Sequence, residues 1–574
     1  MAEVGTAHGT LTADALRAWV RGAAELLTLA RPVIDRANVF PVADADTGTN
    51  MWLTLGEGRE NVDALSADAD VDAVLHALAE GALLGARGNS GVILSEYLRG
   101  FAAGARGSHT GSAAATVVAA LREGARCAHA AVGQPRQGTI LSAAAGAAHA
   151  AQGALDAGAD LCRVVQDARG GAQDALRRSA DDLDVLREAG VLDAGAYGLV
   201  LVLDALCRAL GGDGPVSEGQ GRIAPMTVLT TLSVEPSGSD ADEVVAACAH
   251  EQVGRPVGAG VDGEFEVMYV VEHSTDGSGT SEVSLSAVAG LLRDELRHIG
   301  DSVAVVGGPT GQDRDGTSHG LWQVHVHTDR PLEALRAGQP WTQRQVVVRS
   351  LEHQVSSAAH EQEESPGPAA LGIVACTASP GLVTELARAG AVVVLRESVP
   401  VAANDVRRAV EETGAREVLL LPADAATREA ARTWVSDAGA MPAAGQDRVR
   451  LHVLESASDL QVVAAMARWA TVPPAPDRAE PAHLVEMLGA AVGSVRSTAV
   501  QDADPANVCA ALALLLSPDH GSVTVLTVLV DDAVPDEVTD AVVGAAERLA
   551  PGIDVVALAS GRRSGTVVLG VERE

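Results

Sequence analysis

A short polar segment near the N-terminus holds the densest group of residues whose types could perform chemistry. Asp44 and Asp46 stand two residues apart in this segment, which begins at Asn38. Directly after them come Thr47, Gly48, Thr49 and Asn50. Carboxylates two apart in a loop can converge on a hard cation, and the hydroxyl, amide and N–H groups that follow can bind phosphate oxygens. A polar turn whose side chains cap the neighbouring backbone is the simpler alternative.

Three more polar loops each precede a stretch with helical periodicity. They are Gly85–Gly91, which includes Arg87, then Gly138-Thr139, and then Asp193–Gly198. A glycine-containing turn that leads into a helix places free N–H groups and a positive dipole end at one point, which suits a phosphate. An ordinary helix connection is the alternative for each loop alone. Four loops of one kind in one region favour a shared anion site.

The elements that must position these loops are helices. Thr12 can cap a segment in which Leu16, Val20 and Leu27 share one face. The same periodicity predicts helices at residues 71–86, 92–103, 114–131, 141–155 and 198–210. Strand signals are nearly absent, so we expect an all-α domain over residues 1–212.

The rest of the chain predicts strands alternating with helices. We expect a middle α/β domain over residues 223–350 and a two-lobed α/β domain over residues 369–574. The predicted strands are residues 227–234, 266–272, 302–306, 321–328, 371–375, 391–395, 417–421, 449–454, 523–530 and 566–571. Glycine-rich or proline-rich polar segments at residues 211–221, 360–368 and 473–481 read as linkers.

Composition excludes several classes of function. The 574 residues carry a formal net charge of −34, and only 12 are Phe, Trp or Tyr, so neither a nucleic-acid surface nor a stacking platform is expected. The chain has no lysine, which rules out a Walker-type phosphate loop and Schiff-base chemistry. Scattered cysteines, no signal peptide and no apolar run of membrane-spanning length predict a soluble cytoplasmic protein.

Four ordered motifs resemble a known family. The run NVFPVADADTGTNM resembles the metal-binding signature of the dihydroxyacetone kinase L-type domain. With ARGNSGVILSEYLRGF, GTILSAAAG and EAGVLDAGAYGL it resembles the bacterial fatty acid kinase catalytic subunit. The resemblance extends through a middle domain ending in VHVHTDRP to a C-terminal domain similar to DegV-type fatty-acid-binding proteins.

The resemblance implies a helical barrel whose loops at one end bind ATP and two Mg²⁺ ions. Asp44 and Asp46 match the metal-binding aspartates, and Asn38 lies where a third ligand is expected. The remaining matches are nucleotide-binding positions: Thr47, Gly48, Thr49, Asn50, Asn89, Ser90, Gly91, Thr139, Asp193, Ala194 and Gly195.

The chain departs from the family pattern at two positions of these loops. Ala45 stands where the family has glycine, and a positive φ there would strain the loop. Ala196 replaces a second glycine. A non-catalytic ATP-binding scaffold is therefore an alternative to a kinase.

His325 and His327 lie two apart in a predicted strand, so both point to one face. They can bind zinc together with a third ligand, and two solvated surface histidines are the alternative. The resemblance implies a metal or structural role for these two with a cysteine of a preceding strand, where this chain has Glu266.

The C-terminal domain begins with Thr377 and Ser379 before a predicted helix. They match hydroxyls that hold a fatty acid carboxylate in DegV-type binders, although helix capping is the simpler explanation of the same residues. In the kinase family this domain is expected to dock a separate fatty-acid-loaded DegV-type carrier. A homodimer is also implied.

The sequence therefore predicts an ATP- and Mg²⁺-dependent kinase subunit that makes an acyl phosphate from a carrier-bound fatty acid. A carboxylate acceptor is already ionised at neutral pH and needs no general base, and the four loops contain no histidine. A dihydroxyacetone kinase-like enzyme acting on a small alcohol or ketose is the alternative reaction.

Overall fold

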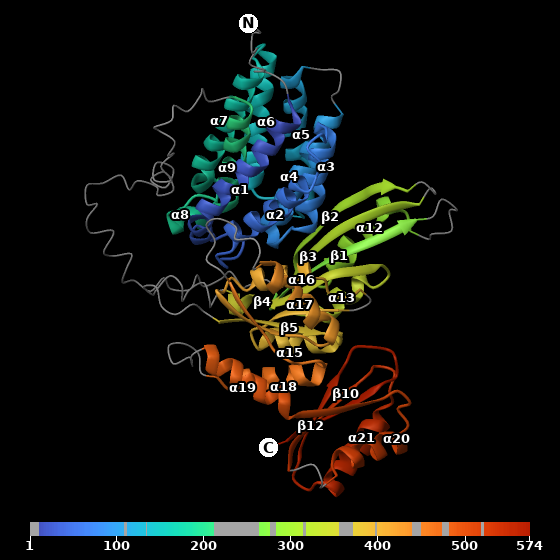
Figure 1. Ribbon diagram of the computed structural model, residues 1–574. Helices are drawn as coiled ribbons and strands as arrows, with labels where there is room; N and C mark the ends of the chain where they lie inside the picture. Colours follow the sequence, from blue (N-terminus) through green and yellow to red (C-terminus); the bar gives the residue numbers. More distant parts are fainter. Residues whose placement is uncertain are drawn as a thin grey trace, which may run out of the picture. The chain divides into compact units, whose positions relative to one another are not determined.

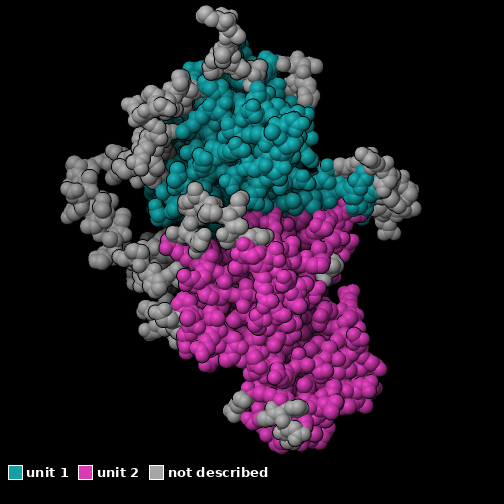
Figure 2. Space-filling model, viewed as in Figure 1, with its two compact units in different colours: residues 1–262, 274–294, 301–325 teal, residues 263–273, 295–300, 326–574 magenta. Residues whose placement is uncertain are grey.

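The computed structural model describes residues 11–107, 112–133, 135–211, 263–275, 283–313, 317–354, 371–396, 399–438, 449–472, 481–517 and 522–573. The chain divides into two compact units, coloured separately in Figure 2. The predicted strand at residues 227–234 lies outside the described residues, as do the predicted linkers apart from Gly211 and Pro481. Within the described residues, no helix has both the length and the apolar character needed to cross a lipid bilayer.

From residue 13 to residue 209 the chain is built of helices (Figure 1). They are α1 (Ala13–Arg36), α2 (Thr47–Asp63), α3 (Val71–Leu84), α4 (Gly88–Arg106), α5 (Ala113–Ala131), α6 (Ile140–Asp156), α7 (Leu161–Asp182), α8 (Asp184–Ala189) and α9 (Ala194–Ala209). The described residues of this region form no strand, which confirms the predicted helical domain. Its closure into a barrel stays a prediction.

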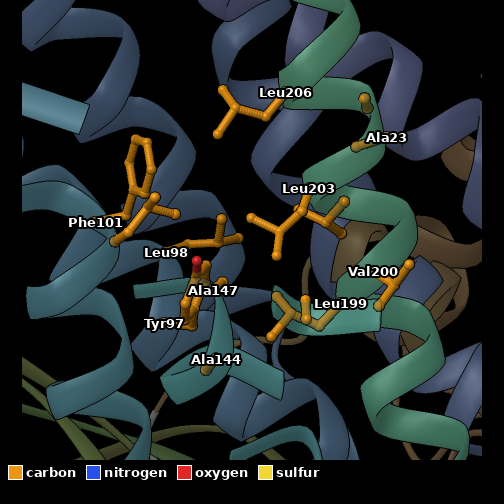
Figure 3. Close-up of a cluster of buried hydrophobic side chains, with 14 of the residues drawn as sticks. Ala23, Tyr97, Leu98, Phe101, Ala144, Ala147, Leu199, Val200, Leu203 and Leu206 are labelled. Carbon is orange, nitrogen blue, oxygen red and sulfur yellow. The ribbon is translucent and has the colours of Figure 1, made fainter. Parts of the chain in front are cut away.

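The apolar face predicted for α1 is buried. Leu16, Val20 and Leu27 are all almost inaccessible to solvent, and the Thr12 side chain caps the helix by accepting from the Ala15 N–H at 3.2 Å. Figure 3 shows side chains of α1, α4, α6 and α9 gathered in one cluster, with Phe101 and Leu203 among them. Burial of such side chains contributes roughly 1.5–3 kcal/mol each, so this cluster holds the helices in place.

The strands form two sheets. The first contains β1 (Phe265–Thr275), β2 (Asp301–Gln312), β3 (Ser318–Thr328), β4 (Thr342–Ser350), β5 (Leu371–Thr377), β6 (Val392–Leu395), β7 (Glu417–Leu421) and β8 (Arg450–Val453). Its strand order is β2-β3-β1-β4-β6-β5-β7-β8. Antiparallel pairing of β4 with β6, for example Val347 with Val394, continues the sheet from the predicted middle domain into the predicted C-terminal domain. The boundary predicted at residues 350–369 therefore separates chain segments that share one sheet.

The second sheet belongs to the last part of the chain. It contains β9 (Val495–Val500), β10 (Val523–Val530), β11 (Asp554–Ala559) and β12 (Val567–Arg573) in the order β11-β10-β12-β9. Leu526, Val528 and Leu569 lie in its buried core. The division of residues 369–574 into two lobes stays a prediction.

The remaining helices accompany these strands. They are α12 (Leu285–Leu296), α13 (Pro331–Gly338), the 3₁₀ turn η1 (Pro380–Leu382), α15 (Val383–Arg388), α16 (Ala403–Glu412), α17 (Ala425–Ala438), α18 (Asp459–Trp469), α19 (Pro481–Ser494), α20 (Pro505–Leu515) and α21 (Asp536–Leu549).

Candidate functional site

The loop between α1 and α2 places the predicted metal ligands beside one another. The Asn38 amide nitrogen donates a hydrogen bond to the Asp44 carboxylate. This bond leaves the buried Asn38 Oδ1 without a hydrogen-bond partner among the described residues. A buried acceptor with no donor is costly unless something else pairs with it, and a cation would do so. Asn38 and Asp44 therefore fit an oxygen-lined Mg²⁺ site.

Ala45 has the positive φ at which strain is expected for a residue other than glycine. Its φ is +54°, in the left-handed region that an alanine enters only at a cost. The turn at Ala45 separates Asp44 from Asp46, which immediately precedes the first residue of α2. The loop thus keeps the shape that a glycine would adopt without strain.

Asp35, in the last turn of α1, is a carboxylate of this site that sequence interpretation missed. It accepts hydrogen bonds from both the N–H and the hydroxyl of Thr49 at 2.9 Å. Burial raises the pKa of Asp35 to about 6, and repulsion from Asp46 adds to the effect while the bonds from Thr49 oppose it. The available signal was an acidic residue in the last turn of a helix, where the helix dipole disfavours it.

The predicted phosphate-binding residues Thr47, Gly48, Thr49 and Asn50 form the first turn of α2. Gly48 permits a close approach to α1, because a Cβ there would lie 2.6 Å from the Arg31 carbonyl oxygen. Thr49 uses its N–H and hydroxyl to hold Asp35. Its predicted role as a direct nucleotide contact stays a prediction.

The second loop lies against the first. Gly88, with φ of +52°, begins α4 and leaves room for the Asn50 side chain, which a Cβ at residue 88 would strike. In the same way, a Cβ at Gly91 would strike the hydroxyl of Thr54 on α2. These close approaches bring the first turns of α2 and α4 together, and the predicted Asn89 and Ser90 lie in that turn of α4.

The third and fourth loops share a carboxylate. Asp193 caps α9 by accepting from the Ala196 N–H at 2.7 Å, and it also accepts from the Ile140 N–H at the start of α6. Burial raises the pKa of Asp193 to about 7, against the effect of these bonds. Thr139 caps α6 through the Leu141 N–H, and Ala194 and Gly195 open α9.

The four helix starts therefore form one connected arrangement. Gly198 of α9 contacts Met51 of α2, which links the α6–α9 pair to the α2–α4 pair. Four positive helix ends suit a polyphosphate, and the adjoining carboxylates suit the cations that accompany it. This combination can bind a nucleotide and transfer a phosphoryl group.

The predicted zinc ligands His325 and His327 are buried, so the alternative of two solvated surface histidines is wrong. Glu266 on β1 joins them, and one ligand atom from each of the three lies within 4.8 Å of the others. Their burial depends on strands that pair only in the folded sheet.

A guanidinium already contacts the third member of this group. Arg349 on β4 donates through Nε to Glu266, and its Nη1 lies 3.1 Å from Glu412 Oε2. A zinc ion at Glu266 would lie beside that positive charge, which repels it. The donor types fit zinc but the electrostatics do not, so zinc stays a prediction that requires Arg349 to leave Glu266.

Thr377 and Ser379 do not cap a helix. Ser379 stands at the N-cap of η1 but makes no side-chain capping bond. Both residues are fully buried, and both hydroxyls donate to Asp459. The capping alternative is therefore wrong.

Comparison with known proteins identifies two segments. Residues 41–208 match the DAK2 domain, and residues 262–358 match the FakA-like middle domain of fatty acid kinases. The chain is 28% identical over 422 residues to Protein YloV of Bacillus subtilis, covering 72% of this chain and 70% of that one. An uncharacterized protein of Staphylococcus haemolyticus is 27% identical over 435 residues, with the same coverage.

Among solved structures, a dihydroxyacetone kinase from C. freundii in complex with AMP-PNP and Mg²⁺ is similar. The identity is 16%, the TM-score is 0.26, and the match covers 36% of each chain.

Proposed function

We propose that this chain, a kinase that joins a DAK2 domain to a FakA-like middle domain, transfers the γ-phosphate of ATP to a fatty acid held by a partner protein. The product would be an acyl phosphate. The observation that carries the proposal is the connected arrangement of four helix N-termini beside the Asn38–Asp46 loop.

In this proposal the acidic loop holds the metal. Asp44, Asp46 and the orphaned Asn38 Oδ1 would hold Mg²⁺, with two ions expected. When bound, the metal neutralises charge on the transferred phosphoryl group. The two aspartates are positioned in advance, because Asn38 holds Asp44 and Asp46 is the residue that immediately precedes α2.

The helix starts would bind the nucleotide. N–H groups and side chains of the first turns of α2 and α4 face the phosphates in this proposal, with Thr139 and residues 193–195 completing the site. Backbone donors fixed by helices need no reorganisation as charge develops, which is the source of most phosphoryl-transfer catalysis.

The acceptor is proposed to be a carboxylate. It carries its charge at neutral pH and can attack without a general base, in accord with the absence of histidine from the four loops. A small alcohol would need a base, and the two carboxyls of this site with raised pKa, Asp35 and Asp193, are each committed to backbone donors.

The partner is proposed to be a DegV-type fatty-acid-binding carrier, docked by the C-terminal region, in the cytoplasm. A homodimer of the chain is part of the same proposal. The C-terminal region is the expected docking platform because its own hydroxyl pair is engaged internally.

The test is ADP release with Mg·ATP in three parallel reactions: the chain alone, with a fatty-acid-loaded carrier, and with dihydroxyacetone. Hydroxylamine added to each reaction converts an acyl phosphate, but not an alcohol phosphate, into a hydroxamate. ADP release that depends on the loaded carrier and is accompanied by hydroxamate formation supports the proposal. Release that depends on dihydroxyacetone, without hydroxamate, would move the acceptor to a small alcohol or ketose. If the chain binds ATP but releases no ADP in any of the three reactions, the result favours the alternative of a non-catalytic ATP-binding scaffold.

A further inference from the structure

The loop after β5 occupies the position at which α/β sheets bind ligands. β5, β6, β7 and β8 are parallel and lie in the order β6-β5-β7-β8. The chain therefore runs to one side of the sheet when it leaves β5 for β6 and to the other side when it leaves β7 for β8. Such a reversal creates a topological switch point at the carboxyl ends of the two central strands. Residues 377–379 lie at that point.

Three donors in this loop converge on one carboxylate. The Thr377 hydroxyl donates to Asp459 Oδ1 at 2.9 Å, and the Ala378 N–H donates to the same oxygen at 3.0 Å. The Ser379 hydroxyl donates to Asp459 Oδ2 at 2.5 Å. Both carboxylate oxygens are thus bound, as they would be in a site built for a carboxylic acid.

Asp459 reaches this position from a distant part of the chain. It is the first residue of α18, about 80 residues after the loop, and it is buried together with Thr377 and Ser379. Ser458 caps the helix by accepting from the Gln461 N–H, so Asp459 is not needed for capping. The Asp459 side chain is committed to the loop instead.

We propose that residues 377–379 form a carboxylate-binding cradle and that Asp459 occupies it as an internal ligand. The cradle would accept a small free monocarboxylate only when the Asp459 carboxylate is absent. This inference stands without the kinase proposal. Its consequence for that proposal is that an acyl acceptor's carboxylate is not held here and must be presented from elsewhere.

The experiment is rescue of stability in the full-length chain. Asp459→Ala removes the carboxylate and leaves space for formate, whereas Asp459→Gly leaves space for acetate. Each variant is expected to lose thermal stability, because three buried donors lose their acceptor. At concentrations about tenfold above the dissociation constant, the matching anion should raise Tm by about 3 °C relative to equal chloride.

Two controls define the result. Asp459→Asn keeps the cradle filled and should show no response specific to formate. Asp504→Ala removes the carboxylate that caps α20 at the solvent-exposed surface and should be equally insensitive. If the glycine and alanine variants do not fold in chloride, their refolding yield in formate or acetate is measured instead.

Equal behaviour of formate, acetate and chloride in both variants, in stability and in refolding, would overturn the proposal. So would saturable binding of decanoate by the unaltered chain that Ser379→Ala abolishes, because an occupied cradle cannot hold it. A purely structural role for Asp459 predicts loss of stability without any anion dependence.

Discussion

Replacing Ala45 by glycine should stabilise the helical domain. Ala45 holds a φ of +54° between Asp44 and Asp46. The contacts on both sides over-determine this conformation, because Asn38 binds Asp44 and the first turn of α2 follows Asp46 directly. A glycine would adopt the same backbone without the clash between Cβ and the following carbonyl oxygen.

The magnitude follows from two opposing terms. A left-handed conformation costs a non-glycine residue about 1–2 kcal/mol. Glycine loses about 0.5–1 kcal/mol more conformational entropy on folding than alanine. The net gain in the free energy of unfolding from Ala45→Gly is therefore about 1 kcal/mol.

Ala43→Gly is the matched control. Ala43 is exposed, lies in the same loop and has no positive φ, so glycine there brings only the entropy cost of about 0.5–1 kcal/mol. The two variants should move the free energy of unfolding in opposite directions. Because the entropy cost is the same in both, the difference between them should equal the strain cost of about 1–2 kcal/mol.

The assay is urea unfolding of the full chain, followed by far-ultraviolet circular dichroism through the transition that removes the helical signal. A higher midpoint for Ala45→Gly and a lower one for Ala43→Gly are expected. If both variants lowered the free energy of unfolding by the same amount, the reasoning would be refuted, because residue 45 would then not be strained.

Three further predictions concern buried polar groups. The buried Tyr97 hydroxyl has no hydrogen-bond partner among the described residues, so Tyr97→Phe should raise the free energy of unfolding by about 1 kcal/mol. A lower free energy of unfolding for Tyr97→Phe, measured by urea titration, would contradict this prediction. Asp193 has a pKa raised from 3.8 to about 7, so its stabilising contribution is complete below pH 4 and is lost as pH rises through 7. Relative to Asp193→Asn, the free energy of unfolding of the unaltered chain should fall by up to about 4 kcal/mol between pH 4 and pH 8. If the free energies of unfolding of the two proteins changed in parallel with pH, the raised pKa of Asp193 would be refuted. Because Arg349 contacts Glu266, zinc content by mass spectrometry should be well below one ion per chain and should rise in Arg349→Met; stoichiometric zinc in the unaltered chain would show that the group binds metal as it stands.

Much of the fold is local and could be predicted from the sequence. The apolar face of α1 and its Thr12 cap follow from spacing within one helix, and they are confirmed. Most strands that were predicted consist of short runs of apolar residues. The strands that sequence analysis missed are β4, β9 and β11.

The missed strands have physical reasons. β9 and β11 are the two edges of the second sheet, and edge strands carry many exposed positions that weaken the apolar signal. β4 begins with the polar run Thr-Gln-Arg-Gln and is defined by its partners β1 and β6, which are distant in sequence.

The candidate site likewise combines residues that a local motif predicts with residues that only the folded chain brings together. The D-x-D loop and the glycine-containing helix starts are contiguous motifs, whereas Asp35 becomes part of the site only because α2 folds back and Thr49 binds it. The buried ion pair between Arg349 and Glu266 joins strands about 80 residues apart. No local pattern encodes such contacts.

The most direct test of the central claim compares the acidic loop with a matched surface position. Asp44→Asn and Asp46→Asn each keep the side-chain shape and remove the charge, and Asp68→Asn makes the same change at an exposed residue. Acyl hydroxamate is measured with Mg·ATP, loaded carrier and hydroxylamine, alongside circular dichroism to verify folding. We predict hydroxamate formation by the unaltered chain and by Asp68→Asn, and its loss from both loop variants. Full turnover in the folded Asp44→Asn and Asp46→Asn variants would contradict the assignment of this loop as the metal site of a kinase.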